Sequence, residues 1–243
     1  MRIELDTHTH TLASGHAYST IAEMIDAAAQ KGLKLLGITE HAPAMPGSCK
    51  EFYFHNLKIL PRFQRGVEMM FGVELNIIDY TGRVDLSERS MEYTDLRIAS
   101  LHPPCINPGT MEENTAAVIG AIHNPKVDIL GHPDDGRYPL DYEQVIREAK
   151  KYGKIVELNN NSLSPLNPRA NARENDLIIL DLCRKYEVPV VMNTDAHVSF
   201  MVGDLKDAMQ LVEEAGFPKE LILNDSVEKF KHFLNEGRKC CKG

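Results

Sequence analysis

The stretch Asp6-Thr7-His8-Thr9-His10 sets an aspartate and two histidines at alternate positions near the start of the chain. The residues before it also alternate, with Ile3 and Leu5 on one side, and predict a β-strand. Because the side chains of a strand point to opposite faces in turn, we expect Asp6, His8 and His10 to share one face. The two imidazoles then lie about 6.6 Å apart along the backbone, close enough for both to bind one cation. The stretch therefore predicts part of a metal site at the end of a strand.

The composition is that of an ordinary globular protein, with 243 residues of which 43 % are hydrophobic and 26 % charged. This length suits one large α/β domain or two small ones, and we expect a single domain over residues 1–243. No apolar run approaches the roughly 20 residues that span a bilayer. The N-terminus enters a strand at once, which leaves no room for a signal peptide. We therefore predict no contact with a membrane.

The five cysteines, Cys49, Cys105, Cys183, Cys240 and Cys241, are scattered and form no Cys-x-x-Cys pair. An odd, scattered set argues against a disulfide framework and against a zinc knuckle, and it predicts a cytoplasmic protein. The last two belong to a basic tail, and we expect residues 236–243 to be frayed. The net charge of −8 argues against a broad nucleic-acid-binding face. A small anionic substrate remains compatible with this charge, because metal ions in a cleft would outweigh it locally.

Runs typical of strands alternate with amphipathic helical stripes along the whole chain. The expected strands cover residues 3–5, 35–39, 67–75, 96–100, 127–130, 155–158 and 188–193. The first helix is expected to begin at a capping box formed by Thr20 and Glu23 and to end at Gly32. Strands separated by helices pair in parallel, either in an open sheet or in a barrel.

The positions of the polar residues decide between these two architectures. Nearly every candidate ligand follows a different expected strand, at its C-terminal end. In an open sheet, only the strands beside the crossover point could share one site, whereas all the strand ends of a barrel surround one mouth. We therefore predict a barrel of seven β/α units.

Nine residues make up the candidate metal site at this mouth. Seven of them are histidines, out of ten in the chain, and random scatter would not concentrate them at strand ends. The nine are His8, His10, His16, His41, Glu74, His102, His132, Asp195 and His197. The remaining histidines, His55, His123 and His232, fall in expected helices or at their edges, and we interpret them as surface or packing residues.

The donor types indicate which metals would bind. Nine donors are too many for one zinc ion, which takes four, but they suit three divalent ions if one carboxylate bridges two of them. Imidazole and carboxylate without cysteine favour Zn²⁺, Mn²⁺ or Fe²⁺ over Mg²⁺ and Ca²⁺. The sequence alone leaves the choice among these three metals open.

The motifs that contain these residues resemble those of the PHP (polymerase and histidinol phosphatase) domain family, and within it the YcdX-like phosphatases. The matching motifs are His8-Thr9-His10 with His16 downstream, Thr39-Glu40-His41, Gly72-Val73-Glu74, Ser100-Leu101-His102, Gly131-His132-Pro133 and Asn193-Thr194-Asp195-Ala196-His197. The resemblance covers essentially the whole chain and leaves no ligand position of the family unmatched. It implies a distorted (β/α)7 TIM-like barrel, a trinuclear metal site that usually holds zinc, and phosphoesterase activity.

The resemblance also implies how the ligands divide among the ions. His8, His10, Glu74 and Asp195 would hold the first ion. Glu74, acting as a bridge, would hold the second with His102 and His132. The third would be held by His16, His41 and His197. The spacing of the residues supports the set of nine, but this division rests on the resemblance alone.

Four charged residues near the strand ends are candidates for supporting roles. Asp6 shares a face with His8, and we expect it to orient a ligand ring. Arg169 and Arg173 follow the sixth strand, where either could bind a phosphate oxygen or remain a solvated loop arginine. Asp134 follows His132 and could protonate the leaving group.

The sequence does not assign a role to Asp135 or to the three asparagines after the sixth expected strand. Asp135 could protonate the leaving group instead of its neighbour Asp134, and the sequence does not assign this acid. Asn159, Asn160 and Asn161 could bind substrate or merely cap the turn after the sixth strand.

These features together predict a metal-dependent phosphatase, a phosphoric monoester hydrolase that activates water at its metal site and acts on a small phosphorylated substrate. One alternative is a histidinol phosphatase or a PHP-type nuclease or phosphodiesterase; the acidic net charge argues against the nuclease. A second alternative is a non-catalytic metal-binding regulatory protein, against which the complete ligand set argues. The resemblance suggests a homo-oligomer, and the physiological substrate stays open.

Overall fold

The computed structural model describes residues 1–167 and 169–240, and its strands form one sheet in the order β1-β2-β4-β5-β6-β7-β8. These seven strands run parallel, while the two-residue strand β3 pairs antiparallel with β4. The strands are β1 (Leu5–Asp6), β2 (Leu35–His41), β3 (Phe63–Gln64), β4 (Val67–Asn76), β5 (Arg97–Ser100), β6 (Ile129–Leu130), β7 (Ile155–Asn159) and β8 (Val190–Asn193).

The sheet curls into a ring that closes between β8 and β1 without a regular ladder. Near the C-terminal ends of these strands, Thr9 and Ala196 form a parallel bridge, and the His10 N–H donates to the Ala196 carbonyl at 2.9 Å. Near their N-terminal ends, the segment 222–224 fills the gap, because Ile222 bridges to β8 and the Asn224 carbonyl accepts from the Glu4 N–H. The predicted seven-unit β/α barrel is therefore confirmed.

The side chain of Asn224 connects the two sides of this seam. Its amide nitrogen donates to the carbonyls of Leu5 at 3.2 Å and Met192 at 2.7 Å, and its Oδ1 accepts from the Met192 N–H at 2.7 Å. Asn224 is fully buried. It therefore satisfies backbone groups of β1 and β8 that an eighth strand would otherwise pair.

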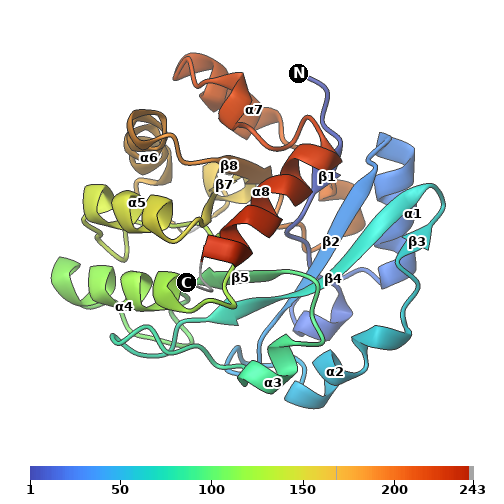
Figure 1. Cartoon of the computed structure of the whole chain (residues 1–243). Helices are drawn as coiled ribbons and strands as arrows, with labels where there is room; N and C mark the ends of the chain where they lie inside the picture. Colours follow the sequence, from blue (N-terminus) through green and yellow to red (C-terminus); the bar gives the residue numbers. More distant parts are fainter. Residues whose placement is uncertain (168, 241–243) are drawn as a thin grey trace.

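The N-terminal half of the barrel interior is apolar. One buried cluster joins strand residues that include Leu5, Leu35 and Ile129 to Phe230 and Leu234 of helix α8. Figure 1 shows α8 crossing in front of the ring of strands, with the other helices around it. Because hydrophobic packing fills and covers this end, polar side chains inside the barrel gather at the opposite end, where the strands stop.

Helices cover the outside of the ring. They are α1 (Ile21–Lys31), α2 (Glu51–His55), α3 (Glu88–Met91), α4 (Met111–His123), α5 (Tyr142–Lys151), α6 (Ala172–Tyr186), α7 (Lys206–Glu214) and α8 (Val227–Cys240). The predicted capping box at Thr20 and Glu23 starts α1, and Gly32 ends it in a left-handed conformation. As predicted, His55, His123 and His232 lie on helices, in α2, α4 and α8.

The C-terminal segment differs from expectation. Residues 236–240, which we expected to be frayed, form the last turns of α8. Arg238 explains this order, because its guanidinium donates to the buried carboxylate of Asp128 at 2.7 and 2.8 Å. The expectation for residues 241–243, including Cys241, lies outside the described residues.

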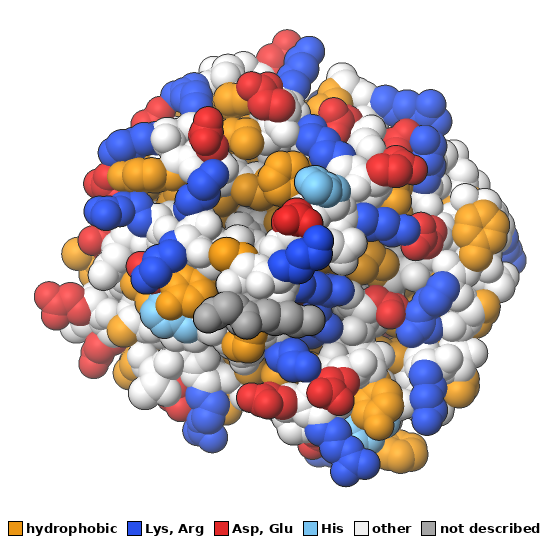
Figure 2. All heavy atoms as spheres, viewed as in Figure 1, with side chains coloured by type: hydrophobic (Ala, Val, Ile, Leu, Met, Phe, Trp, Pro, Cys, Tyr) orange, Lys and Arg blue, Asp and Glu red, His pale blue; other side chains and the backbone are white. Residues whose placement is uncertain are grey.

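The surface facing the viewer in Figure 2 mixes both signs of charge with single apolar side chains. This face is the one crossed by α8, at the apolar end of the barrel. Among residues 1–167 and 169–240, no helix has the length and apolar character needed to cross a membrane.

Replacing Asn224 with alanine tests the closure of the barrel. Asn224→Ala leaves the Met192 N–H and two carbonyls without partners in a buried seam, so we expect the free energy of unfolding to fall by about 2–4 kcal/mol. Urea denaturation of the metal-free protein measures it. Asn235→Ala, at an exposed position of α8, should change stability by less than about 0.5 kcal/mol. Equal stabilities for both variants would contradict the role assigned to Asn224.

Candidate metal centre

The nine candidate ligands meet at the C-terminal mouth of the barrel. They come from the ends of β1, β2, β4, β5, β6 and β8 or from the loops that follow these strands. All are buried except His16, which is exposed, and His197, which is half-buried. Residues up to 189 positions apart in the chain therefore share one small polar volume, as the sequence predicts.

Glu74, on β4, is the central carboxylate of this group. Its Oε2 lies 2.8 Å from His41 Nδ1, 3.3 Å from His8 Nε2 and 3.4 Å from His10 Nε2. Its Oε1 lies 2.9 Å from His132 Nε2 and 3.2 Å from His102 Nε2. Each oxygen thus faces a different set of imidazoles, which is the arrangement expected of a carboxylate that bridges two ions.

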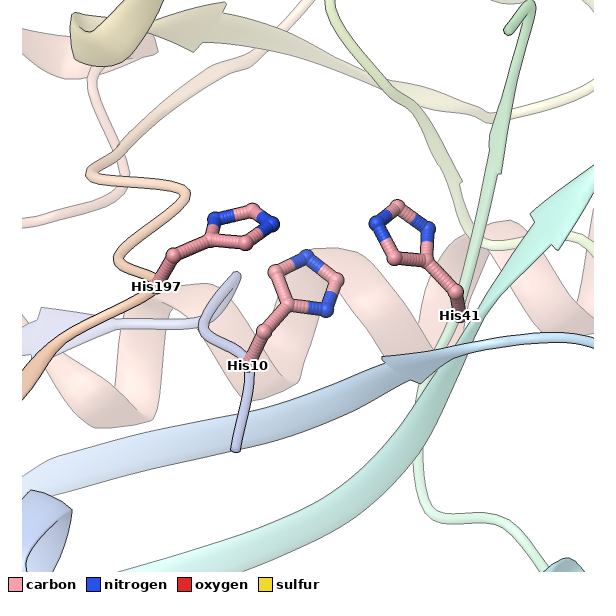
Figure 3. Close-up of side chains that lie close together, drawn as sticks. All are labelled: His10, His41 and His197. Atoms are coloured by element: carbon pink, nitrogen blue, oxygen red, sulfur yellow. The ribbon is translucent and has the colours of Figure 1, made fainter. Parts of the chain in front are cut away.

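Asp195 and the remaining histidines complete the group on the side of β1 and β8. Asp195 Oδ1 lies 3.3 Å from His10 Nε2 and 3.6 Å from both His8 Nε2 and His197 Nδ1. The ring of His16 lies 4.9 Å, between centroids, from those of His41 and His197. In Figure 3 the ring of His10 lies between those of His41 and His197, at centroid distances of 4.3 and 4.5 Å.

Hydrogen bonds fix the protonation of two central rings. His8 Nδ1 lies 2.7 Å from the carboxylate of Glu157, which can only accept, so this nitrogen carries the proton. His10 Nδ1 lies 3.0 Å from Ser14 Oγ, whose own proton goes to Glu40, so His10 Nδ1 is also the donor. In their neutral forms, both rings therefore present Nε2 lone pairs, and these two nitrogens lie only 3.1 Å apart. Two facing lone pairs repel each other unless a positive charge lies beside them.

Two further rings follow the same rule. His102 Nδ1 donates to Asn76 Oδ1 at 2.8 Å, because the amide nitrogen of Asn76 is used for Ala42 and Asp85. His197 Nδ1 donates to the carbonyl of Asp195 at 2.8 Å. In each ring Nε2 is then the free nitrogen, and that of His102 faces Glu74. Neutral imidazole with a free ring nitrogen is the form that ligates metals.

The electrostatics of the group also demand positive charge. Burial by itself lowers the pKa of His8, but the negative charges of Glu157, Glu74 and Asp195 raise this pKa well above its ordinary value. Burial raises the pKa of Glu74, yet the neighbouring His8, His102 and His41 hold it well below the usual range. The pKa of His10 is lowered by burial and by His41 and His197. Protons or metal cations must therefore neutralise the carboxylates here.

The backbone adopts sparsely populated conformations at two of the ligand positions. His132 has φ +26° and Asp195 has φ +52°, both in the left-handed region that non-glycine residues rarely adopt. Gly37 allows another close approach, since a Cβ there would lie 2.5 Å from the carbonyl oxygen of Thr7. Such local strain is typical of functional sites, where the surrounding contacts hold it in place.

The donor set fits divalent metal ions. Three subsets bring one donor atom from each residue within 4.8 Å of the others: His8, His10 and Glu74; His10, His41 and His197; and His41, Glu74 and His102. Glu74 Oε2 and His41 Nδ1 lie 2.8 Å apart and are buried, yet neither makes a well-aligned hydrogen bond with any residue that the structure describes. Nitrogen and carboxylate donors without thiolate are those that Zn²⁺, Mn²⁺ and Fe²⁺ accept.

Asp6 does not take the position expected for it. Its carboxylate points away from the rings and accepts hydrogen bonds from the Thr194 hydroxyl at 2.5 Å and from the N–H groups of Thr194 and Gly203. The strict alternation assumed for this stretch fails because β1 ends at Asp6. Glu157 orients the ring of His8 instead.

The two candidate arginines separate in the structure. Arg169 is buried against the group, where its guanidinium donates to Asp195 Oδ2 at 3.1 Å and to Ser162 Oγ at 2.6 Å. Arg173 lies in the first turn of α6 with a half-exposed side chain and pairs with Glu214 on α7. Of the two, only Arg169 contacts the candidate ligands.

The candidate asparagines also differ from one another. Asn159 donates to Glu157 Oε2 at 3.1 Å and to Asp195 Oδ2 at 3.3 Å, and its Oδ1 caps the following 3₁₀ turn. Asn160 accepts from the Ala208 N–H on α7, which is a structural contact. Asn159 therefore both supports the ligands and caps the turn.

Asp134 and Asp135 have different surroundings. Asp135 pairs with Arg137 at 2.6 Å, and although burial raises its pKa, this partner lowers it below the usual value. Asp134 is fully buried with no hydrogen-bond partner for either oxygen among the described residues. Burial raises the pKa of Asp134, against the opposing charge of Arg169. Of the two, Asp134 is the one that retains a proton more easily.

Sequence reasoning missed the residues that orient the ligand rings. They are Glu157 for His8, Ser14 for His10, and Asn76 for His102. Glu157 and Asn76 occur in buried, mainly apolar strands, where a polar side chain needs a polar partner. A polar residue among apolar strand residues was the feature of the sequence that could have identified them.

A family model described as the PHP domain matches residues 6–163 of the chain. A probable phosphatase of Caldanaerobacter subterraneus is 48 % identical, with 98 % of this chain and 94 % of the relative covered. A probable phosphatase of Thermoanaerobacter sp. is 45 % identical, with 98 % of this chain and 97 % of the relative covered. A probable phosphatase of Clostridium novyi is 43 % identical, with 96 % of this chain and 95 % of the relative covered.

Two solved structures share the fold at 17 % identity. One is histidinol phosphate phosphatase from Lactococcus lactis in complex with zinc, L-histidinol and phosphate, with a TM-score of 0.61 over 88 % of this chain and 94 % of that one. The other is a chain of archaeal ribonuclease P with mature tRNA, with a TM-score of 0.58 over 98 % and 91 %. By the family model and by relatives that match nearly its full length, the chain belongs to the PHP domain family.

Proposed function

We propose that this protein is a metal-dependent phosphatase that hydrolyses a small phosphorylated substrate. The observation that carries the proposal is the 3.1 Å approach of His8 Nε2 and His10 Nε2, two nitrogens whose rings donate elsewhere through Nδ1. Relatives 42–48 % identical that are named probable phosphatases support the reaction class.

Three divalent ions, zinc in this proposal, would be held by the nine ligands. His8, His10, Glu74 and Asp195 would hold the first, and Glu74, His102 and His132 the second. His16, His41 and His197 would hold the third. When bound, such ions supply a water molecule of lowered pKa and positive charge against the phosphoryl oxygens.

Arg169 would bind the phosphoryl group beside this centre. Its side chain is only 9 % exposed, and it already faces one carboxylate oxygen of Asp195. A planar guanidinium in a buried site forms short, charge-assisted hydrogen bonds with phosphate oxygens. Ser162, which accepts from Arg169, holds the other side of the guanidinium.

Asp134 is the candidate proton donor for the leaving alkoxide. Burial raises its pKa, which is the direction that a proton donor requires at neutral pH. It lies two residues after the candidate ligand His132, with Pro133 between them.

The alternatives differ in their products. A histidinol phosphatase or another monoesterase releases inorganic phosphate, whereas a nuclease releases mononucleotides. The acidic net charge of −8 favours the monoesterase. A regulatory protein would bind metal without turning over any ester, and the complete ligand set argues against it. A panel of phosphorylated metabolites, with histidinol phosphate among them, separates these cases.

The proposal also includes the cellular compartment and the oligomeric state of the protein. The described cysteines Cys49, Cys105, Cys183 and Cys240 are free thiols, as expected of a cytoplasmic protein. We expect a homo-oligomer from the family resemblance.

Removing the metal tests the reaction. We expect hydrolysis of an aryl phosphate to fall by at least about 100-fold after chelation and to return when Zn²⁺ or Mn²⁺ is added back, because the ions supply both nucleophile and charge. The assay measures released phosphate alongside the metal content of the same sample. Activity that persists at less than one ion per chain would sink the proposal.

The exposure of His16 predicts that the third ion is the most labile. His16→Ala should retain two ions per chain where the wild type retains three, as counted by elemental analysis after gel filtration. An exposed ligand is easily replaced by water, whereas buried ligands are held by their neighbours. His232→Ala, on an exposed position of α8, should retain three. Loss of all ions in His16→Ala would contradict the assignment.

The two arginines provide a matched pair for the phosphoryl contact. Arg169→Lys should lower kcat/KM for an aryl phosphate by about 10- to 100-fold, because one ammonium replaces a charged hydrogen-bonding fork. Arg173→Lys keeps its pairing with Glu214 and should leave kcat/KM within about twofold of the wild type. Similar losses in both variants would remove Arg169 from the site.

A further inference from the structure

The carboxylate of Glu157 connects four segments at the base of the metal centre. Its Oε1 accepts from His8 Nδ1 at 2.7 Å and from Asn193 Nδ2 at 2.8 Å. Its Oε2 accepts from the His132 N–H at 2.9 Å and from Asn159 Nδ2 at 3.1 Å. Glu157 is buried and lies on β7, a strand that contributes none of the nine candidate ligands.

Each of these donors is fixed by its own surroundings. The Asn193 amide cannot flip, because its Oδ1 already accepts from both the N–H and the hydroxyl of Thr7 at 2.8 Å. Asn159 uses its Oδ1 to accept from the Ser162 N–H. The His132 N–H belongs to the backbone. Among the four, only His8 can change from donor to acceptor, by moving its proton to Nε2.

We infer that Glu157 is a positioning residue that keeps the proton of His8 on Nδ1 and thereby leaves Nε2 free to bind a metal ion. It also holds the strained backbone of His132, where φ is +26°, through the N–H of that residue. One carboxylate thus orients a ligand from β1 and a ligand after β6. The inference rests on the metal centre of the proposed function.

The isosteric variant Glu157→Gln makes this role measurable. In this variant an NH₂ group replaces one of the two carboxylate oxygens and faces two of the four donors. It cannot replace Oε2, because the backbone N–H of His132 points at that position and can only donate. The amide nitrogen will therefore occupy the Oε1 position and donate to His8 Nδ1. His8 then carries its proton on Nε2, where it can donate to His10 Nε2, which lies 3.1 Å away. This arrangement removes the acceptor of Asn193 Nδ2, a smaller loss than the two donors that would lose theirs at the Oε2 position, and it blocks a metal ligand.

The test combines two measurements on the folded protein. ¹⁵N NMR of the imidazoles in metal-free protein, assigned with a His8→Asn variant and recorded at a pH high enough for His8 to be neutral, should show Nδ1 of His8 protonated in the wild type and unprotonated in Glu157→Gln. Competition with a chelator should show that Glu157→Gln binds its most tightly held ion about 10- to 100-fold more weakly.

The matched control is Asp128→Asn, at the other end of the barrel. Asp128 is also a buried carboxylate with several donors, from Arg97 and Arg238, but it contacts none of the histidines. This variant should lose stability yet keep the His8 proton on Nδ1 and the metal affinity of the wild type.

Several results would overturn the inference. They are an unprotonated His8 Nδ1 in the wild type, unchanged metal affinity in Glu157→Gln, or an equal loss of affinity in Asp128→Asn. The wild-type NMR measurement does not depend on Glu157→Gln, so a misfolded Glu157→Gln does not remove the test. Neither readout involves ester hydrolysis. Failure of the phosphatase proposal, seen as ion binding without turnover, is therefore distinguishable from failure of this inference.

Discussion

The short contact between the Nε2 atoms of His8 and His10 is the constraint on which the rest of the site depends. Both rings donate through Nδ1, to Glu157 and to Ser14, so their remaining lone pairs converge with the oxygens of Glu74 and Asp195. Such a group is stable only with positive charge in its centre. The carboxylates raise the pKa of His8 for the same reason that they would attract metal ions. Ion binding at this site should therefore release protons.

The seam between β8 and β1 explains how the fold keeps so polar a group in place. No regular ladder joins these strands, and hydrogen bonds of side chains connect them instead. Asn224 bonds to the backbone of both strands near their N-terminal ends. Further along, Thr7 donates to Asn193, and Thr194 donates to Asp6. The candidate ligands that follow β1 and β8 lie in the segments directly after these hydrogen bonds. The apolar packing of α8 at the other end supplies the stability that the polar mouth does not.

The buried carboxylates of this chain show how surroundings divide roles among identical groups. Glu74 faces five imidazoles and is suited to bridge ions, whereas Glu157 accepts four hydrogen bonds and holds other groups in position. Asp6 and Asp134 sit close to ligands in the sequence, yet Asp6 secures a loop and Asp134 has unpartnered oxygens. Proximity along the chain is thus a poor guide to role inside a barrel, because one residue of shift changes the face on which a side chain lies.

The sequence by itself determined the seven β/α units and the set of nine candidate ligands. Both follow from local regularities: apolar runs alternate with helical stripes, and histidines and carboxylates recur at strand ends that only a barrel can bring together. The tertiary structure alone decided which groups support these ligands. Glu157 replaces Asp6 beside His8, and Arg169 rather than Arg173 reaches Asp195. These pairings join residues from different strands and loops, and their choice depends on where β1 ends and where α6 begins, which local patterns do not encode.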